Sequence, residues 1–169
     1  NTLITIIDEN TMHPEVAIEY VEKLSDFYRS ILQYREQESI SLEEEWELVQ
    51  NFIYLLEKRY GTNLRLHMDV PPKNAYILPL TLQMLVENAV KHNVISEKYP
   101  LDLYITIEGD DYVVVKNTMK PKSKAEPSTQ FGLQSIIKRY QLLSDQKVIV
   151  ESTSDFFKVC IPIIKKSDA

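Results

Sequence analysis

Four polar side chains in the stretch Leu80–Asn93 are spaced so that they would meet on one side of a helix. Glu87 and Lys91 are four residues apart, and so are Asn88 and His92. Residues four apart are neighbours on a helix surface, so a carboxylate, an amide, a cation and an imidazole gather within about one and a half turns. Mg²⁺ binds oxygen ligands, keeps several waters and often shares its shell with substrate phosphates. The group therefore indicates a site for a nucleotide and its metal ion.

The same residues also have an ordinary structural explanation. Glu87 and Lys91 could form a surface ion pair, which is worth only about 0.2–0.5 kcal/mol. Asn88 could cap or bond a neighbouring loop. For a helix taken alone this explanation is the better one, so the surrounding sequence has to decide.

The stretch itself has the pattern of an amphipathic helix. Pro79 suits a first helical turn, where proline costs little. Apolar residues then recur at three- and four-residue spacing and give one apolar face: Leu82, Leu85, Val86, Ala89 and Val90. The helix is predicted to end near Ser96, before Pro100.

The motif at residues 87–93, Glu-Asn-Ala-Val-Lys-His-Asn, resembles the N-box of the LytS-like sensor histidine kinases, within the wider GHKL group of ATPases. The preceding run at residues 78–86, Leu-Pro-Leu-Thr-Leu-Gln-Met-Leu-Val, is similar to that family too. The motif and its lead-in are fairly specific, and they favour the functional explanation over the structural one.

This resemblance assigns roles to the polar residues of the motif. It implies that Asn88 coordinates a Mg²⁺ ion that bridges the phosphates of ATP. It implies that Lys91 lies near those phosphates, with His92 and Asn93 as further candidates. Glu87 would polarise the attacking or the leaving group.

Composition limits the classes of protein to consider. The chain has 169 residues, 44% of them apolar, which is enough for a core, and a net charge of −6. Nucleic-acid binding needs clustered Lys and Arg, so no nucleic-acid partner is expected. Cys160 is the single cysteine, so an internal disulfide is excluded and a reducing cytoplasmic setting is expected. There is no run of 18 apolar residues, so a membrane would be reached only through segments that this sequence lacks. The abrupt apolar start at Asn1 suggests a fragment of a longer protein.

The first part of the chain predicts two helices that form a hairpin. The first runs from Pro14 to about Tyr34. The second starts at Ser41, where Ser41 and Glu44 have the spacing of a capping box, and it stops at Gly61. One helical hairpin rarely buries its own apolar stripe, so pairing with a second copy in a four-helix bundle is expected.

This part also resembles the dimerisation region of the family, at residues 24–29, 40–45 and 57–60. In the family the phosphorylated histidine lies in a His-Phe-Leu-Phe-Asn segment, and Asn1-Thr2-Leu3 looks like the end of it. The resemblance therefore implies an acceptor histidine upstream of Asn1, without which this fragment would be inactive alone. His13 and His67 are expected to be structural or solvated.

The remaining chain predicts one mixed sheet with helices on one face. Strands are expected at 63–70, 101–108, 112–117, 147–152 and 156–164, a helix at 132–143, and an unstructured loop at 119–130. This order is similar to the ATP-binding fold of the GHKL group, in which the loop would be the lid over the nucleotide. The predicted fold class is thus α+β, with a helical hairpin before a GHKL-type α/β sandwich.

The glycine-rich boxes of the group are altered here. Where the group has Asp-x-Gly-x-Gly, this chain has Asn117-Thr118-Met119, and Asn117 can still accept a hydrogen bond from the adenine amino group. Where the group has Gly-x-Gly-Leu, this chain has Gln130-Phe131-Gly132-Leu133. Gly132 and Leu133 would lie at the phosphates, at the start of a helix. Gln130 adds bulk at that point, and an ordinary helix-start glycine is the alternative explanation for Gly132.

These observations predict two domains, a dimerisation region at 1–61 and an ATP-binding domain at 62–169. The predicted function is the cytoplasmic kinase core of a membrane-anchored sensor histidine kinase, which would use ATP and Mg²⁺. The phosphoryl group would pass to the upstream histidine and then to an Asp of a response regulator receiver domain. The expected partners are a second copy of the chain and that regulator. A degenerate kinase that acts as a dimeric interaction module is the alternative, and a GHKL ATPase outside signalling is a third reading.

Overall fold

The computed structural model describes residues 14–34, 36–122 and 131–165. Residues 1–13, including His13, and the middle of the expected lid with Gln130 lie outside the described residues. The helices and strands follow in this order: α2 (Pro14–Tyr34), β1 (Ile40–Ser41), α3 (Leu42–Tyr60), the 3-10 turn η1 (Gly61–Asn63), β2 (Leu64–Met68), β3 (Tyr76–Ile77), α4 (Thr81–His92), β4 (Leu101–Glu108), β5 (Tyr112–Thr118), α5 (Phe131–Leu143), β6 (Ile149–Ser152) and β7 (Phe156–Pro162).

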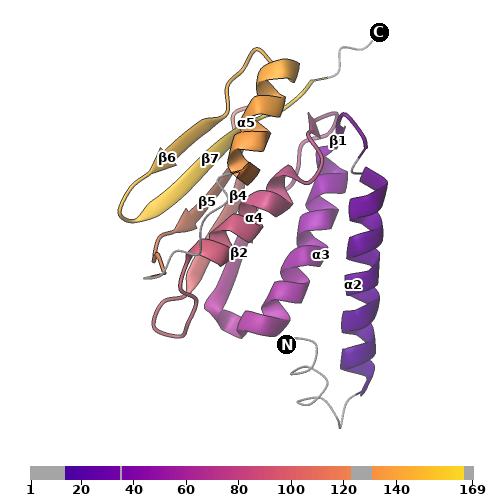
Figure 1. The fold of residues 1–169 in the computed structure, drawn as a ribbon, viewed down its shortest axis with the longest axis vertical. Coiled ribbons are helices and arrows are strands. Elements are labelled where there is room, and N and C mark those ends of the chain that lie inside the picture. The colour runs from indigo at the N-terminus through magenta and orange to yellow at the C-terminus, as the bar shows by residue number, and fades with distance from the viewer. Residues whose placement is uncertain (1–13, 35, 123–130, 166–169) are drawn as a thin grey trace.

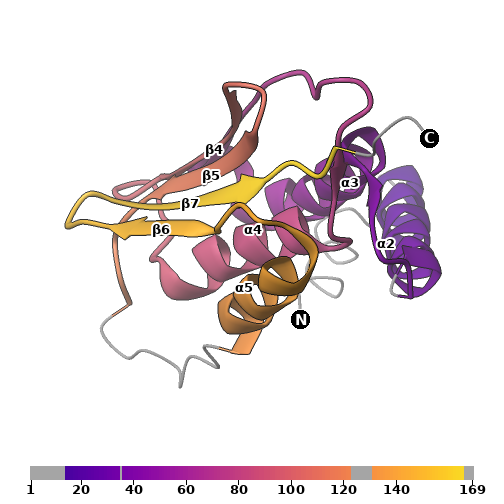
Figure 2. The ribbon, with the colours of Figure 1, turned by 90° about the horizontal axis from the view of Figure 1, so that it is seen from above.

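The main sheet has five strands in the order β2-β4-β5-β7-β6. β2 runs parallel to β4 and the other neighbours are antiparallel. Helices α3, α4 and α5 cover one face of this sheet, and α2 lies outside α3 (Figures 1 and 2). The predicted α+β class and the mixed sheet with helices on one face are confirmed. None of the described helices is both long and apolar enough to cross a bilayer.

Helix α3 begins with the predicted capping box. The backbone N–H of Glu44 donates to Oγ of Ser41 at 3.2 Å, and the backbone N–H of Ser41 donates to the Glu44 carboxylate at 2.8 Å. The helix ends before Gly61, whose φ of 55° lies in the left-handed region that glycine tolerates. Its apolar face, which includes Trp46 and Val49, is buried.

One hydrophobic core joins α3 to the sheet. The core runs from Ile40 to Ile163 and includes Trp46 and Ile53 of α3 together with residues of α4, α5 and the strands. Helix α2 contributes instead to a small separate cluster, where the rings of Phe27 and Phe52 stack at 5.1 Å. The expected division after residue 61 therefore falls inside one core, and the packing groups α3 with the sheet.

The ends of α4 differ from the prediction. Helix α4 starts at Thr81, so Pro79 lies before the helix and not in its first turn. Leu80 precedes the first turn with φ 63°, a left-handed conformation that a leucine rarely adopts. The helix stops at His92, short of the expected Ser96, because Asn93 is extended and bonds back to the helix. The two-stranded pairing of β1 with β3 was not predicted.

The shared core makes a prediction about truncation. A fragment that begins at Ser39 keeps α3 and is expected to unfold in one cooperative transition. A fragment that begins at residue 62 loses several buried side chains, each worth about 2–5 kcal/mol, which together exceed a typical domain stability of about 5–15 kcal/mol. Urea unfolding followed by far-ultraviolet circular dichroism measures both. A cooperative transition at the same midpoint for the shorter fragment would place α3 outside the folding unit.

Candidate functional site

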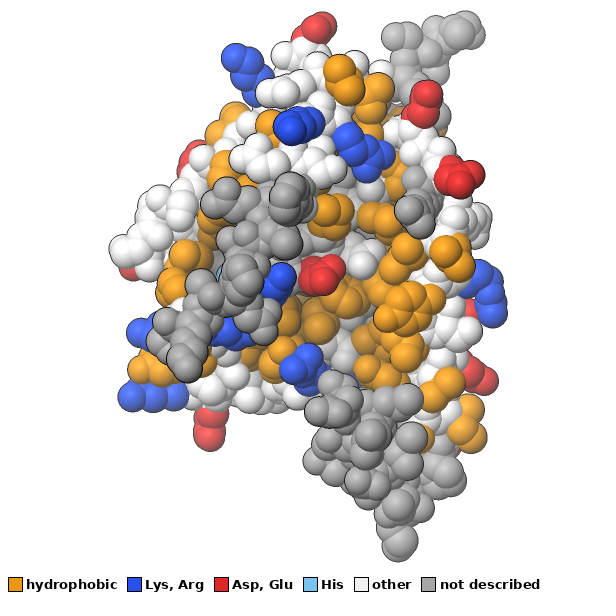
Figure 3. Space-filling view, viewed as in Figure 1, with side chains coloured by type: hydrophobic (Ala, Val, Ile, Leu, Met, Phe, Trp, Pro, Cys, Tyr) orange, Lys and Arg blue, Asp and Glu red, His pale blue; other side chains and the backbone are white. Residues whose placement is uncertain are grey.

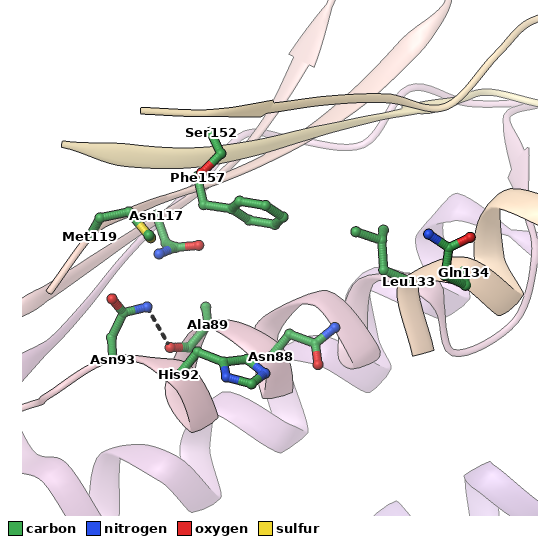
Figure 4. A pocket seen from close by; sticks show the side chains of 10 residues that line it. All are labelled: Asn88, Ala89, His92, Asn93, Asn117, Met119, Leu133, Gln134, Ser152 and Phe157. Carbon is green, nitrogen blue, oxygen red and sulfur yellow. Dashed lines mark hydrogen bonds between the residues drawn. The ribbon is translucent and has the colours of Figure 1, made fainter. Parts of the chain in front are cut away.

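A pocket of about 640 Å³ lies between the helices and the sheet. This volume is in the range of small-molecule sites. Figure 4 shows its walls, which come from α4, β5, α5, β6 and β7. Its lining residues are Asn88, Ala89, His92, Asn93, Asn117, Met119, Leu133, Gln134, Ser152 and Phe157. Five residues singled out from the sequence thus lie around one pocket: Asn88, His92, Asn93, Asn117 and Leu133.

Strand register accounts for the sheet side of the pocket. Asn117 of β5 pairs with Phe157 of β7, and Phe157 pairs with Ser152 of β6. Directly paired residues point to the same face of a sheet, so these three side chains form a row above α4 (Figure 4). Sequence reasoning placed only Asn117 here. The strands themselves were predicted, but no residue type signals which positions on neighbouring strands are paired.

The helix side of the pocket is the polar face of α4. Asn88 and His92 are one turn apart and both lie toward the pocket, opposite Asn117 and Phe157 (Figure 4). Asn88 and His92 are both partly exposed, so solvent and ligands can reach them. The predicted i, i+4 arrangement of these two side chains is therefore what the structure presents to the pocket.

Asn117 is held in one orientation. Its side-chain nitrogen donates to the carbonyl oxygen of Thr118 at 2.7 Å, and its side-chain oxygen points into the pocket (Figure 4). Asn117 is only 3% exposed. The pocket wall therefore presents a fixed hydrogen-bond acceptor beside the ring of Phe157, which suits a flat ligand with one donor group on its edge.

Asn93 is committed to the protein itself. Its side-chain nitrogen donates to the carbonyl oxygen of Ala89 at 2.9 Å, and its side-chain oxygen accepts the backbone N–H of Lys120 at 2.7 Å. The ammonium of Lys122 donates to the carbonyl oxygen of Lys91 at 2.7 Å. These bonds hold residues 119–122, the first part of the expected lid, against the end of α4.

The beginning of α4 is held by buried side chains from two other helices. The carboxylate of Glu45 on α3 accepts the backbone N–H groups of Leu80 at 2.9 Å and Leu82 at 2.8 Å. The hydroxyl of Tyr140 on α5 accepts the N–H of Leu78 at 3.2 Å. Burial raises the pKa of Glu45 to about 7, although its bonds to backbone N–H groups oppose the rise. Burial also raises the pKa of Tyr140 above its usual range.

Three residues predicted for the site do not line the pocket: Glu87, Lys91 and Gly132. Glu87 is exposed on α4. Gly132 lies close to the pocket nonetheless, since a Cβ atom there would be 3.2 Å from Cε of Met84 and 3.9 Å from the side-chain nitrogen of Asn88. The start of α5 therefore approaches α4 most closely beside Asn88.

The described wall of the pocket is neutral apart from His92. None of the ten lining residues is Asp, Glu, Lys or Arg. Apolar side chains, namely Phe157, Leu133 and Met119, share the lining with amides and a hydroxyl. Such a surface can hold a planar aromatic ligand by apolar contact and orient it by hydrogen bonds.

Comparison with known proteins gives consistent results for the two parts of the chain. A family model described as histidine kinase matches residues 1–64. The sensor protein LytS of Staphylococcus saprophyticus is 33% identical over 107 residues, which are 62% of this chain and 18% of that protein. The sensor histidine kinase/phosphatase LytS of Staphylococcus aureus strain MRSA252 is 31% identical over 109 residues, 63% of this chain and 19% of that protein. The matched region is thus about a fifth of the length of these relatives.

Solved structures show the same fold. The nucleotide-free catalytic domain of histidine kinase ThkA superposes with a TM-score of 0.52 and 18% identity, over 73% of this chain and 95% of that one. The cytoplasmic segment of histidine kinase QseC superposes with a TM-score of 0.52 and 17% identity, over 90% of this chain and 95% of that one.

The bonds of Asn93 make a prediction about stability. Asn93→Ala would leave two buried backbone groups unpaired, at Ala89 and Lys120, and each costs about 1–3 kcal/mol. We expect the free energy of unfolding to fall by about 2–4 kcal/mol in urea titrations. Gln50→Ala, an exposed amide on α3, is the control and should change it by less than about 0.5 kcal/mol. An unchanged midpoint for Asn93→Ala would contradict the anchoring role.

Proposed function

We propose that this chain, which belongs to the LytS-like histidine kinase family, contains the ATP-binding kinase core of a two-component sensor. The observation that carries the proposal is the pocket in which Asn88 and His92 on α4 face Asn117 and Phe157 on the sheet. Its volume and its mixture of apolar walls and fixed polar groups suit a nucleotide. The nucleotide-binding unit would run from about Ile40, because α3 shares the core of the sheet.

Adenine would occupy the sheet side of the pocket. Its exocyclic amino group is a donor, and the fixed side-chain oxygen of Asn117 is an acceptor. Phe157 and Leu133 would contact the faces of the base. Guanine carries a carbonyl oxygen at the equivalent position, which would meet the oxygen of Asn117 without a proton between them. We therefore propose ATP in preference to GTP.

The phosphates would lie toward Asn88, with Mg²⁺ held by the side-chain oxygen of that residue. Among the described residues no group of three His, Cys, Asp or Glu side chains could hold a metal. A single amide ligand fits Mg²⁺ all the same, since this ion keeps several waters and takes its other oxygens from phosphates. The bound ion would neutralise the phosphate charge, which is the main requirement of phosphoryl transfer.

The other predicted residues take roles that follow from their positions. Lys91 and His92 would neutralise or bond the phosphates beside Asn88. Backbone N–H groups at Gly132 and Leu133, at the start of α5, would face phosphate oxygens. Asn93 would act by anchoring residues 119–122 and not by direct contact, because both ends of its amide are already bonded. Glu87, exposed on α4, would polarise the incoming acceptor histidine from the solvent side.

The phosphoryl group would pass to a histidine that precedes residue 1, and then to an Asp of a response regulator receiver domain. The chain would be the cytoplasmic part of a membrane-anchored sensor. The uncharged lining of the described pocket, apart from His92, also suits the alternative of a degenerate kinase that keeps the fold and binds nucleotide weakly. Measurement of ATP binding separates the two.

Substitution of Asn88 tests the kinase proposal. Calorimetric titration of the chain with ATP in the presence of Mg²⁺ should show saturable binding that Asn88→Ala weakens at least tenfold. The loss should disappear when Mg²⁺ is replaced by EDTA, because the amide acts through the metal. Asn51→Ala, an amide on α3 outside the pocket, is the matched control. Absence of binding to the wild type at millimolar ATP would leave the interaction-module alternative.

Helix α2 offers a surface for pairing with a second copy. Four of its apolar side chains are exposed at positions that fall along one stripe: Ile18 (58%), Val21 (46%), Tyr28 (59%) and Leu32 (71%). Figure 3 shows hydrophobic side chains gathered over the α2 and α3 side of the molecule. Burial of such a stripe against its own copy would complete a four-helix bundle, so we propose a homodimer through α2.

Charge reversal on this stripe tests the homodimer. The wild type is expected to sediment as a dimer, and Leu32→Glu combined with Ile18→Glu as a monomer, since two charges per chain would be buried at the interface. Leu142→Glu on α5, where the leucine is 85% exposed, is the control and should stay dimeric. A dimer that survives the α2 substitutions, in analytical ultracentrifugation, would place the interface elsewhere.

A further inference from the structure

The first turn of α4 lacks the cap that a helix of this kind needs. The first N–H groups of any helix have no partner within the helix, and a Ser, Thr, Asp or Asn side chain at the N-cap usually accepts one of them. Here the N-cap is Leu80, which makes no side-chain bond and has a left-handed backbone. The acceptors come from α3 instead, through the two oxygens of Glu45.

Burial of this carboxylate is unfavourable in itself. Glu45 has no measurable exposure to solvent, and an apolar residue of similar volume would often stabilise a core as well or better. What an apolar residue cannot do is bind the N–H groups of Leu80 and Leu82 and favour the positive end of the helix dipole. The choice of a carboxylate therefore points to the placement of α4 and not to packing alone.

We propose that Glu45 is a positioning residue for the nucleotide site, which fixes the place of Asn88 by holding the first turn of α4. This rests on the function proposed for the pocket. Asn88 follows Leu82 by six residues, about 9 Å along the helix axis. Asn93 holds the other end of α4 to residue 120. With both ends fixed, the distance between Asn88 and Asn117 across the pocket is set, and release of the first turn lets α4 tilt.

The titration of Glu45 gives this role a signature. Burial raises its pKa to about 7, so the carboxyl gains a proton as the pH falls through neutrality. A protonated carboxyl has lost part of its acceptor capacity, and its hold on Leu80 and Leu82 weakens. The titratable group facing it from α5 is Tyr140. On the α2 side, Tyr34 is bonded to the neighbouring Glu44 and not to Glu45.

Nuclear magnetic resonance of the ¹⁵N-labelled chain tests the proposal without any ligand. Between pH 5.5 and 8.5, a range of about 1.5 on each side of neutrality, the amide signals of Leu80 and Leu82 should shift with a midpoint near 7. The side-chain amide of Asn88 should shift with the same midpoint. A His92→Gln background keeps titration of the adjacent imidazole out of the Asn88 signal. If Leu80 and Leu82 titrate while Asn88 does not follow, the first turn does not position the site and the proposal fails.

Variants separate positioning from stability. Glu45→Gln keeps one acceptor oxygen but leaves one N–H unpaired, so the titration should vanish and the Asn88 signal should move. Glu47→Gln, exposed on the same helix, should retain the wild-type titration. Val49→Ala, buried on α3, should lower the melting temperature without moving the Asn88 signal. An Asn88 signal in Glu45→Gln that matches the wild type would show a purely structural role.

Affinity for ATP with Mg²⁺ supplies the second readout. We expect Glu45→Gln to weaken binding at least tenfold at pH 8, and Val49→Ala to stay within twofold of the wild type. Equal weakening in both variants would assign the effect to stability and overturn the proposal. If the wild type itself does not bind ATP, the proposed function fails, and the Asn88 signals still decide whether Glu45 positions α4. If Glu45→Gln does not fold, the wild-type titration decides alone.

Discussion

The first turn of α4 depends on hydrogen-bond acceptors that its own sequence does not supply. Glu45 and Tyr140, both inaccessible to solvent, provide these acceptors from α3 and α5. This constraint ties the three helices of the layer together, since the acceptors can reach the turn only if all three lie at fixed positions on the sheet. Leu80 can keep a left-handed backbone because its N–H is paired in this way.

The pocket follows from that arrangement. α4 presents Asn88 and His92 upward, and the register of β5, β7 and β6 presents Asn117, Phe157 and Ser152 downward. A buried amide at Asn93 closes the far end and holds the strand that leaves β5. In the proposed kinase, the apolar walls would serve the base and the amides would orient it, while the charge of the phosphates would be balanced mainly by Mg²⁺ and by α4.

Local patterns predicted most of the fold and part of the site. Periodicity, the capping box and the turn residues fixed five strands and four helices to within a few residues, because these signals act over one element. The N-box spacing also placed Asn88 and His92 correctly on one face. Non-local features escaped. Glu45 looked like one of three acidic residues at a helix start, and only its burial shows that it bonds another helix. Phe157 and Ser152 joined the pocket through strand pairing, which sequence spacing does not encode.

The central claim is that this pocket binds the adenine ring of ATP through Asn117. The most direct measurement is the ¹⁵N spectrum of the chain titrated with ATP and then with GTP, each with Mg²⁺. The account predicts saturable shifts of the Asn117 and Asn88 side-chain amides and of the Phe157 backbone amide with ATP. It predicts much weaker shifts at Asn117 with GTP. Equal shifts with both nucleotides, or shifts confined to residues outside the pocket, would contradict the account.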